Sequence, residues 1–173
     1  MDNSVIFLVG PMGVGKSTIG RALAADLHLG FRDSDRVIED RTGADIPWIF
    51  DMEGEEGFRD RESAVLTELC GENNVVIATG GGIVLRAENR AEMKVSGFVV
   101  NLTASIEQLV ERTTRAKKRP LLQVENPRQK IIELLEFRDP LYRDVAHVLV
   151  STERRSPKTV VQEIISRYKE FSV

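Results

Sequence analysis

The sequence predicts an α/β protein built on a parallel sheet. Apolar runs of about five residues recur along the chain, at 5–9, 75–79, 98–102 and 146–150. Such short apolar runs are typical of strands that are covered on both faces, as in a parallel sheet. The segments between them are long enough to form helical crossovers, and an alternation of strands and helices favours three α/β/α layers.

The first half of the chain supplies the clearest elements. The strand at 5–9 leads into the glycine-rich segment 10–17 and then into a helix, because Ile19, Leu23 and Leu27 recur at every fourth residue. A weaker strand is expected around Phe31, mainly because of its place after this helix. Residues 35–70 do not fit a regular crossover, and long irregular insertions are often binding regions or lids.

The second half of the chain repeats the alternation. A helix is expected around Ile106 and Leu109, and the polar, basic segment 112–127 after it is a second candidate lid. Ser156 and Pro157 predict the start of a last helix, with an N-cap followed by proline at the first helical position. One apolar stripe in this helix is expected to pack on the sheet, formed by Val160, Val161, Ile164 and Ile165.

Length and charge limit the possible functions. The 173 residues predict one domain spanning 1–173, and 24 Lys and Arg against 27 Asp and Glu leave a net charge of -3. This balance gives no overall attraction for nucleic acid or anionic lipid. The only cysteine, Cys70, lies in an apolar helical stretch, and no run approaches the 18 apolar residues of a membrane span. We therefore expect a cytoplasmic monomer that binds neither membrane nor nucleic acid.

The segment Gly10-Pro11-Met12-Gly13-Val14-Gly15-Lys16-Ser17 is a P-loop, which identifies a phosphate site. Its glycines let backbone N–H groups and the following helix N-terminus surround a chain of phosphates. Lys16 is expected to reach the β- and γ-phosphates, and Ser17 to ligate Mg²⁺. The alternative is a glycine-rich turn that binds nothing.

Two acids follow the first helix, Asp33 and Asp35. The strand at 75–79 ends in Thr79 and glycines, where many P-loop ATPases place a metal-binding aspartate, so the acid must come from elsewhere. If this stretch is extended, both acids project to one face, where Asp33 could hold Mg²⁺ and Asp35 could accept a hydroxyl proton. The alternative is a solvated turn in which Asp35 caps a helix that begins near Val37. The Asn-Lys-x-Asp string of guanine-specific enzymes is absent.

Three arginines predict an anionic acceptor beside the nucleotide, namely Arg59, Arg119 and Arg138. Guanidinium groups bind carboxylate and phosphate as two-pronged donors. Sequence spacing does not show that the three converge, and the alternative is that they form surface ion pairs.

Taken together, these motifs resemble the shikimate kinase family from end to end. The resemblance rests on the P-loop with Thr18, Asp33-Ser34-Asp35, Gly57-Phe58-Arg59, Thr79-Gly80-Gly81-Gly82, Arg119-Pro120-Leu121-Leu122 and Pro140-Leu141-Tyr142. It implies a five-stranded parallel sheet in the order 2-3-1-4-5. It also implies transfer of the γ-phosphate of ATP to the 3-hydroxyl of shikimate, which gives shikimate 3-phosphate and ADP.

The resemblance implies a role for each matching residue. The catalytic group would comprise Asp35, Lys16 and Arg119. ATP would contact Gly13, Val14, Gly15, Lys16, Ser17, Thr18, Arg112, Arg119 and Arg155. Shikimate would contact Asp35, Arg59, Arg138 and the backbone of Gly80, Gly81 and Gly82. Mg²⁺ would contact Ser17 and Asp33. Glu62 would orient Arg59. Phe50 and Phe58 would either line the acceptor pocket or belong to the core. Ser34 is expected to point away from both acids and to be free to vary.

Two other functions remain open at this stage. A sibling kinase of the same fold would phosphorylate gluconate or a nucleotide, although the arginine pair favours an acceptor with a carboxylate. A non-catalytic ATP-binding regulator would be expected to lack Lys16 or Asp35, and both are present.

Overall fold

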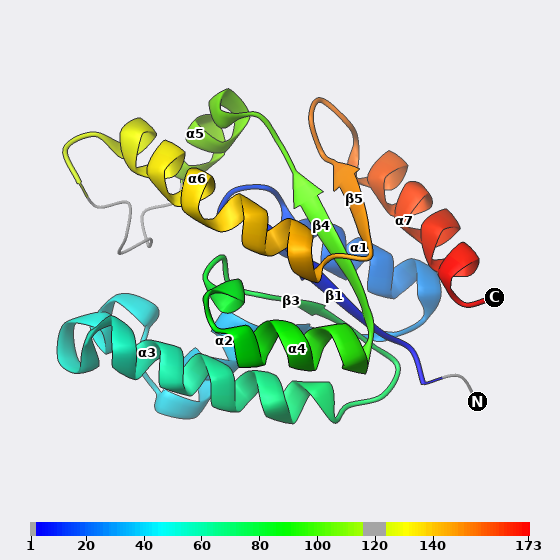
Figure 1. Cartoon of the computed structure of the whole chain (residues 1–173), viewed down its shortest axis with the longest axis horizontal. Coiled ribbons are helices and arrows are strands. Elements are labelled where there is room, and N and C mark those ends of the chain that lie inside the picture. The colour runs from blue at the N-terminus through cyan, green and yellow to red at the C-terminus, as the bar shows by residue number, and fades with distance from the viewer. Residues whose placement is uncertain (1–2, 116–123) are drawn as a thin grey trace.

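The computed structural model describes residues 3–115 and 124–173. One sheet forms the centre, with all strands parallel and in the order β2-β3-β1-β4-β5, as Figure 1 shows. Its strands are β1 (Val5–Val9), β2 (Gly30–Asp33), β3 (Val75–Ala78), β4 (Phe98–Thr103) and β5 (Val148–Ser151). The predicted fold class and strand order 2-3-1-4-5 are thereby confirmed.

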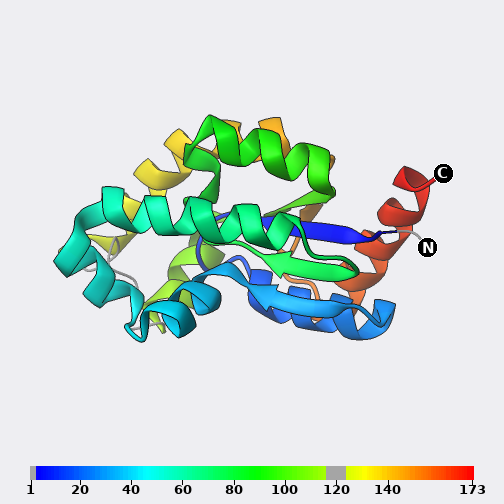
Figure 2. The same ribbon diagram turned by 90° about the horizontal axis from the view of Figure 1, so that it is seen from below.

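Helices cover both faces of the sheet (Figure 2). Helices α1 (Lys16–Leu27) and α7 (Pro157–Phe171) pack against each other on one face. The other face carries α3 (Ile46–Cys70), α4 (Ala87–Ser96) and the C-terminal part of α6 (Pro127–Val145). The shorter elements are α2 (Ser34–Thr42), the 3-10 turn η1 (Ile83–Leu85) and α5 (Ile106–Thr114).

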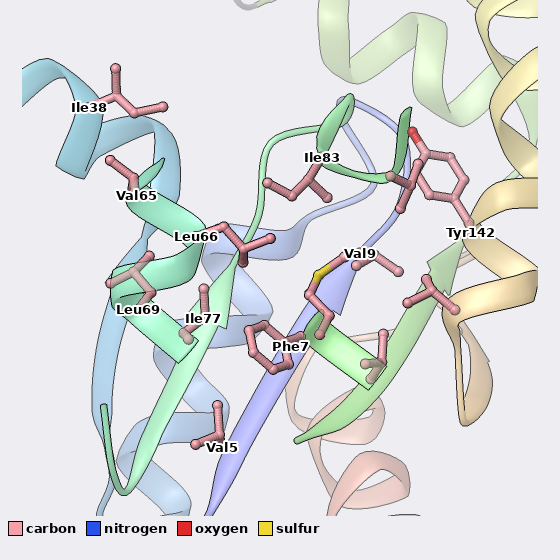
Figure 3. Close-up of a cluster of buried hydrophobic side chains, with 14 of the residues drawn as sticks. Val5, Phe7, Val9, Ile38, Val65, Leu66, Leu69, Ile77, Ile83 and Tyr142 are labelled. Atoms are coloured by element: carbon pink, nitrogen blue, oxygen red, sulfur yellow. The ribbon is translucent and has the colours of Figure 1, made fainter. Parts of the chain in front are cut away.

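The central strand β1 explains why the sheet needs both layers. Its side chains alternate between the two faces, as the period of two in a strand requires. Val5, Phe7 and Val9 belong to the core under α3 and α4, which Figure 3 shows, whereas Ile6 and Leu8 belong to the core under α1 and α7. All five residues are buried, so a strand without polar positions is stable only between two helical layers.

One strand and one helix begin at residues other than those predicted, and helix capping explains both differences. Strand β5 begins at Val148, two residues later than expected, because α6 continues to Val145 and the N–H of its C-cap, Ala146, bonds to Tyr142 O. Helix α2 begins at Ser34 and not near Val37, because the Asp33 side chain accepts hydrogen bonds from Asp35 N and Arg36 N.

The segment 35–70, expected to be an irregular insertion, is almost entirely helical. Helix α2 ends at Thr42 with Gly43 as its C-cap, and Asp45 caps α3 by accepting a hydrogen bond from Trp48 N. Helix α3 is kinked at Gly54, whose φ of 73° and ψ of 177° are not helical. The glycine allows the chain to change direction where an L-residue would be strained.

Candidate active site

The P-loop joins β1 to α1 in a backbone conformation that depends on glycine. Gly10, Gly13 and Gly15 have φ values of 147°, 83° and 105°, which L side chains rarely adopt. Gly15 is also the N-cap of α1, and the first turn of this helix contains no acidic residue. The positive end of the helix dipole is therefore not neutralised by the chain, which favours an anionic ligand there.

Lys16 lies over the loop that precedes it. Its Nζ donates hydrogen bonds to Gly10 O at 2.6 Å and Pro11 O at 2.9 Å. These carbonyl oxygens hold the ammonium group at the loop, where phosphate oxygens would be stronger acceptors because they carry charge.

Ser17, at the N-terminus of α1, meets Asp33, at the C-terminal end of β2. Ser17 Oγ donates to Asp33 Oδ2 at 2.6 Å, and the other carboxylate oxygen, Oδ1, caps α2. The cap orients the carboxylate, so one hydroxyl and one carboxylate oxygen face a common point. Oxygen ligands of this kind fit Mg²⁺, which usually takes one or two protein groups and completes its shell with phosphate and water. Within residues 3–115 and 124–173 there is no cluster of three or more acidic, His or Cys side chains that would hold a metal without such help.

A cavity of about 590 Å³ connects the P-loop to these acids. Its lining includes Gly13, Lys16, Ser17, Asp33, Asp35 and Gly80. The predicted phosphate site and both predicted acids thus share one cavity. The extended arrangement expected for the two acids is wrong, because Asp33 ends a strand whereas Asp35 lies in the first turn of α2.

Two buried arginines from different helices lie behind the loop Gly80–Gly82 and do not themselves line the 590 Å³ cavity. Arg59 of α3 is 7% exposed and Arg138 of α6 is 4% exposed. Both approach the loop Gly80–Gly82 between β3 and η1. A Cβ on Gly82 would collide with the Arg59 guanidinium, and one on Gly81 would lie 3.5 Å from Arg138 Nη1. The glycines therefore let two cations approach the backbone closely.

Glu62 balances part of this charge. Its side chain is fully buried, and Oε1 accepts a hydrogen bond from Arg59 Nη1 at 2.9 Å. Burial raises the pKa of Glu62 to about 7; the neighbouring Asp35 carboxylate adds to this rise, while Arg59 and Arg138 oppose it. The predicted contact between Glu62 and Arg59 is present in the structure.

Two residues at the site were not recognised from the sequence. Ser34 was expected to vary freely, but it is fully buried and its Oγ accepts a hydrogen bond from Gly80 N at 3.1 Å. Tyr142 donates from its hydroxyl to Gly81 O at 2.6 Å, and burial raises its pKa to about 12. Both side chains fix the glycine loop. The motif Pro140-Leu141-Tyr142 contained a signal for Tyr142, whereas a serine between two acids gave none for Ser34.

A smaller cavity of about 240 Å³ lies on the other side of the P-loop, between Arg112 and Arg155. Arg112 Nη1 donates to Val14 O at 2.9 Å and to Gly13 O at 3.3 Å. Arg155 forms an ion pair with Glu163 at 2.5 Å. Both predicted adenine contacts therefore line one cavity, with Thr18.

Not every predicted residue is brought to the site. Phe50 and Phe58 of α3 contact each other with tilted rings whose centroids are 4.8 Å apart, and both pack in the core on that side of the sheet. Neither lines the 590 Å³ cavity. Arg119 lies outside the described residues.

A family model described as "Shikimate kinase" matches residues 12–169. A protein named shikimate kinase from Pseudomonas aeruginosa (strain LESB58) is 58% identical over 166 residues, which cover 96% of each chain. One from Thioalkalivibrio sulfidiphilus is 61% identical over 167 residues, covering 96% of this chain and 87% of the relative. The structure of a shikimate kinase from Acinetobacter baumannii in complex with shikimate superposes with a TM-score of 0.96 at 50% identity, covering 99% of this chain and 96% of the other.

Proposed function

The chain belongs to the shikimate kinase family, whose reaction transfers a phosphate group from ATP to shikimate, and we propose that the two substrates meet in the cavity beside the P-loop. One observation carries this proposal. Two buried arginines, Arg59 and Arg138, converge on the glycine loop, whose Gly80 and Gly81 line the same cavity as the P-loop. The P-loop would thus bind the phosphates, and the arginines behind the glycine loop would bind a carboxylate.

The arginines have donors to offer a ligand. Arg59 Nε and Arg138 Nε are buried and make no hydrogen bond within the described part of the chain. Buried donors without acceptors are costly, so a ligand that supplies acceptors gains affinity from them. The carboxylate of shikimate is an acceptor of the right charge, and backbone groups of Gly80, Gly81 and Gly82 would assist.

The donor side would hold ATP. The backbone from Gly13 to Thr18 and the N-terminus of α1 would surround the phosphates, while Lys16 would exchange its two carbonyl contacts for the β- and γ-phosphates. Arg112 and Arg155 would enclose the adenine. Ser17 and Asp33 would hold Mg²⁺, which when bound neutralises charge on the phosphates.

The chemical step needs a hydroxyl that loses its proton. Asp35 lines the cavity between the P-loop and the glycine loop, so its carboxylate would accept the proton of the shikimate 3-hydroxyl. The oxygen then forms a bond to the γ-phosphorus, and the bond from that phosphorus to the β-phosphate oxygen breaks, with its electrons leaving on ADP. Positioning and charge stabilisation supply most of the catalysis in such transfers.

The remaining assignments concern the whole chain. We propose a single kinase domain spanning 1–173, in which residues 35–70 bind the acceptor and residues 112–127, with Arg119, form the lid.

Since one chain contributes all the residues of the proposed site, a monomer would suffice for activity. Light scattering after size-exclusion chromatography tests whether the protein is a monomer. No helix in residues 3–115 and 124–173 is long and apolar enough to cross a bilayer. Cytoplasmic location remains a prediction, supported by the requirement for ATP.

One assay tests the assignment of the acceptor. ADP release from Mg·ATP is measured with shikimate, gluconate or a nucleoside monophosphate, and shikimate alone is expected to give sustained turnover. No more ADP with shikimate than with buffer would refute the proposal.

The arginine clamp has its own test. Arg59→Lys keeps the charge but loses the planar fork, so the KM for shikimate should rise by about tenfold or more while the KM for ATP changes little. An unchanged KM for shikimate would remove Arg59 from the carboxylate site.

A further inference from the structure

The phosphoryl transfer does not use Glu62, although this carboxylate lies next to the site. Glu62 Oε1 is bonded to Arg59, whereas Oε2 is buried and has no hydrogen-bond partner within residues 3–115 and 124–173. Glu62 Oε2 lies 2.9 Å, and Asp35 Oδ1 lies 2.7 Å, from the point that a Cβ on Gly80 would occupy. Two carboxylates of like charge therefore face each other beside a residue that has no side chain.

The charged groups around Glu62 come from three helices. Its own helix, α3, contributes Arg59, α2 contributes Asp35, and α6 contributes Arg138. The glycine loop contributes no charge. Two buried guanidinium cations thus face the buried carboxylate of Glu62 and the partly buried carboxylate of Asp35. Glu55 also contacts Arg59, at 3.3 Å, but its side chain is 51% exposed and is solvated.

A substrate carboxylate changes this balance. Its binding between Arg59 and Arg138 would place three carboxylates against two guanidinium groups. Because Glu62 and both arginines are buried, water screens the repulsion between the like charges only in part. We propose that Glu62 takes up a proton when the substrate carboxylate binds, which makes acceptor binding proton-linked. This inference rests on the proposed function.

Glu62 is the group best placed to become neutral. A proton on Oε2 would remove the repulsion with Asp35, while Oε1 would still accept the hydrogen bond from Arg59, so the arginine would keep its orientation. Burial has already raised the pKa of Glu62 to about 7 in the absence of a ligand. Asp35, in contrast, must remain a carboxylate to accept the hydroxyl proton. Glu62 is therefore a positioning residue whose charge adapts to the ligand.

The linkage between shikimate binding and protonation of Glu62 predicts how the Kd for shikimate depends on pH. Below a pH of about 7 Glu62 is protonated with and without ligand, so the Kd for shikimate does not change with pH. Above this pH the free enzyme must take up a proton in order to bind, and the Kd rises by up to about tenfold per pH unit until the pKa of the complex is passed.

Calorimetric titration with shikimate between pH 6 and pH 9 tests the inference. Titrations in buffers of different ionisation enthalpy should reveal uptake approaching about one proton per site near pH 8 in the unmodified enzyme. Glu62→Gln should bind shikimate with a Kd that is independent of pH and with no proton uptake. Glu55→Gln is the matched control, because it removes the exposed carboxylate on the same arginine and should behave as the unmodified enzyme does.

Asp35→Asn separates the two carboxylates, since it should still show proton uptake and a pH-dependent Kd, with the onset shifted to lower pH because Asp35 no longer raises the pKa of Glu62. Loss of the dependence in Asp35→Asn would assign the proton to Asp35 and overturn the inference. A Kd that is independent of pH in the unmodified enzyme, without proton uptake, would also overturn it and would leave the proposed function intact. Failure of shikimate to bind or to support ADP release would instead overturn the proposed function.

Discussion

At the residue scale, the acceptor side of the site depends on glycines, which have no side chain. Gly82 has a φ of -96°, which any residue can adopt, so its backbone does not require glycine. The requirement comes from the Arg59 guanidinium, which occupies the space where a Cβ would lie. The same contact brings the backbone and a buried cation together where the proposed ligand carboxylate would bind.

Gly82→Ala is therefore expected to displace Arg59. The KM for shikimate should rise by about tenfold or more, since an ångström of misplacement in a substrate clamp is costly, while the KM for ATP stays nearly constant. Steady-state kinetics with each substrate varied in turn would measure both values. Gly71→Ala, at a position with an ordinary φ of -84° at the end of α3, is the control for effects on folding. Equal KM values for shikimate in the two variants would contradict the steric argument.

Asp35 is the second residue with a sharp expectation. Asp35→Asn preserves shape but removes the acceptor of the hydroxyl proton, so kcat should fall by roughly 10²-fold or more. ATP binding should persist, because the P-loop contacts are untouched. Nucleotide affinity and turnover measured on one preparation would separate these effects, and retained turnover would exclude Asp35 as the base.

At the element scale, the acceptor arginine is positioned by a kinked helix. The non-helical Gly54 divides α3 into two segments, and Arg61 spans the kink to bind both oxygens of Glu53 at 2.7 Å. The second segment carries Arg59 and Glu62, and its apolar face packs in the core through Leu66 and Leu69. The segment after the kink therefore contributes Arg59 and Glu62 to the site and Leu66 and Leu69 to the core.

Gly54→Ala tests the kink. An alanine at φ 73° and ψ 177° is strained, and no atom lies within 4 Å of its Cβ, so only backbone strain is added. The free energy of unfolding should fall by about 1–3 kcal/mol. Urea unfolding compared with Gly71→Ala would measure the difference. A variant as stable as the control would show that α3 straightens there at no cost.

At the scale of the whole molecule, His147 connects the end of α6 to the sheet. Its Nδ1 accepts a hydrogen bond from Val99 N at 2.9 Å, and its ring packs against Phe98 and Phe171. Burial lowers the pKa of His147, and the nearby Lys94 lowers it further. The neutral imidazole is therefore the form that the folded state prefers.

Stability should consequently depend on pH through His147. Because the folded pKa lies below the unfolded value, this contribution is complete above the unfolded pKa of about 6.5 and is lost as the pH falls through the folded pKa. The raised pKa of Glu62 acts in the opposite direction, as its contribution is lost when the pH rises through about 7. His147→Asn should cancel only the first effect. Urea unfolding of both proteins from pH 5 to pH 8 should show a stability difference that shrinks toward low pH, and a constant difference would contradict this assignment.

Local patterns were sufficient for the sheet and the P-loop. Segments that are adjacent in sequence are also adjacent in space, and here an apolar run, a glycine-rich turn and a helix follow one another directly. Gly10 to Ser17 could therefore be recognised as a P-loop from the sequence alone. The order of the strands followed from the resemblance to a known family. The helical character of residues 35–70 was missed because its caps, Asp33 and Asp45, are single side chains within a polar stretch.

By itself, the sequence determined the P-loop, the parallel α/β fold and the residue types of both halves of the site. Only the tertiary structure decided that Arg59 and Arg138, which are far apart in the chain, converge on Gly80–Gly82 and that Ser34 and Tyr142 hold this loop. The physical reason is the separation along the chain of the residues that determine each feature. Turn geometry and periodicity are set by neighbours in the chain, whereas the approach of α3, α6 and the glycine loop is set by how helices pack on both faces of the sheet.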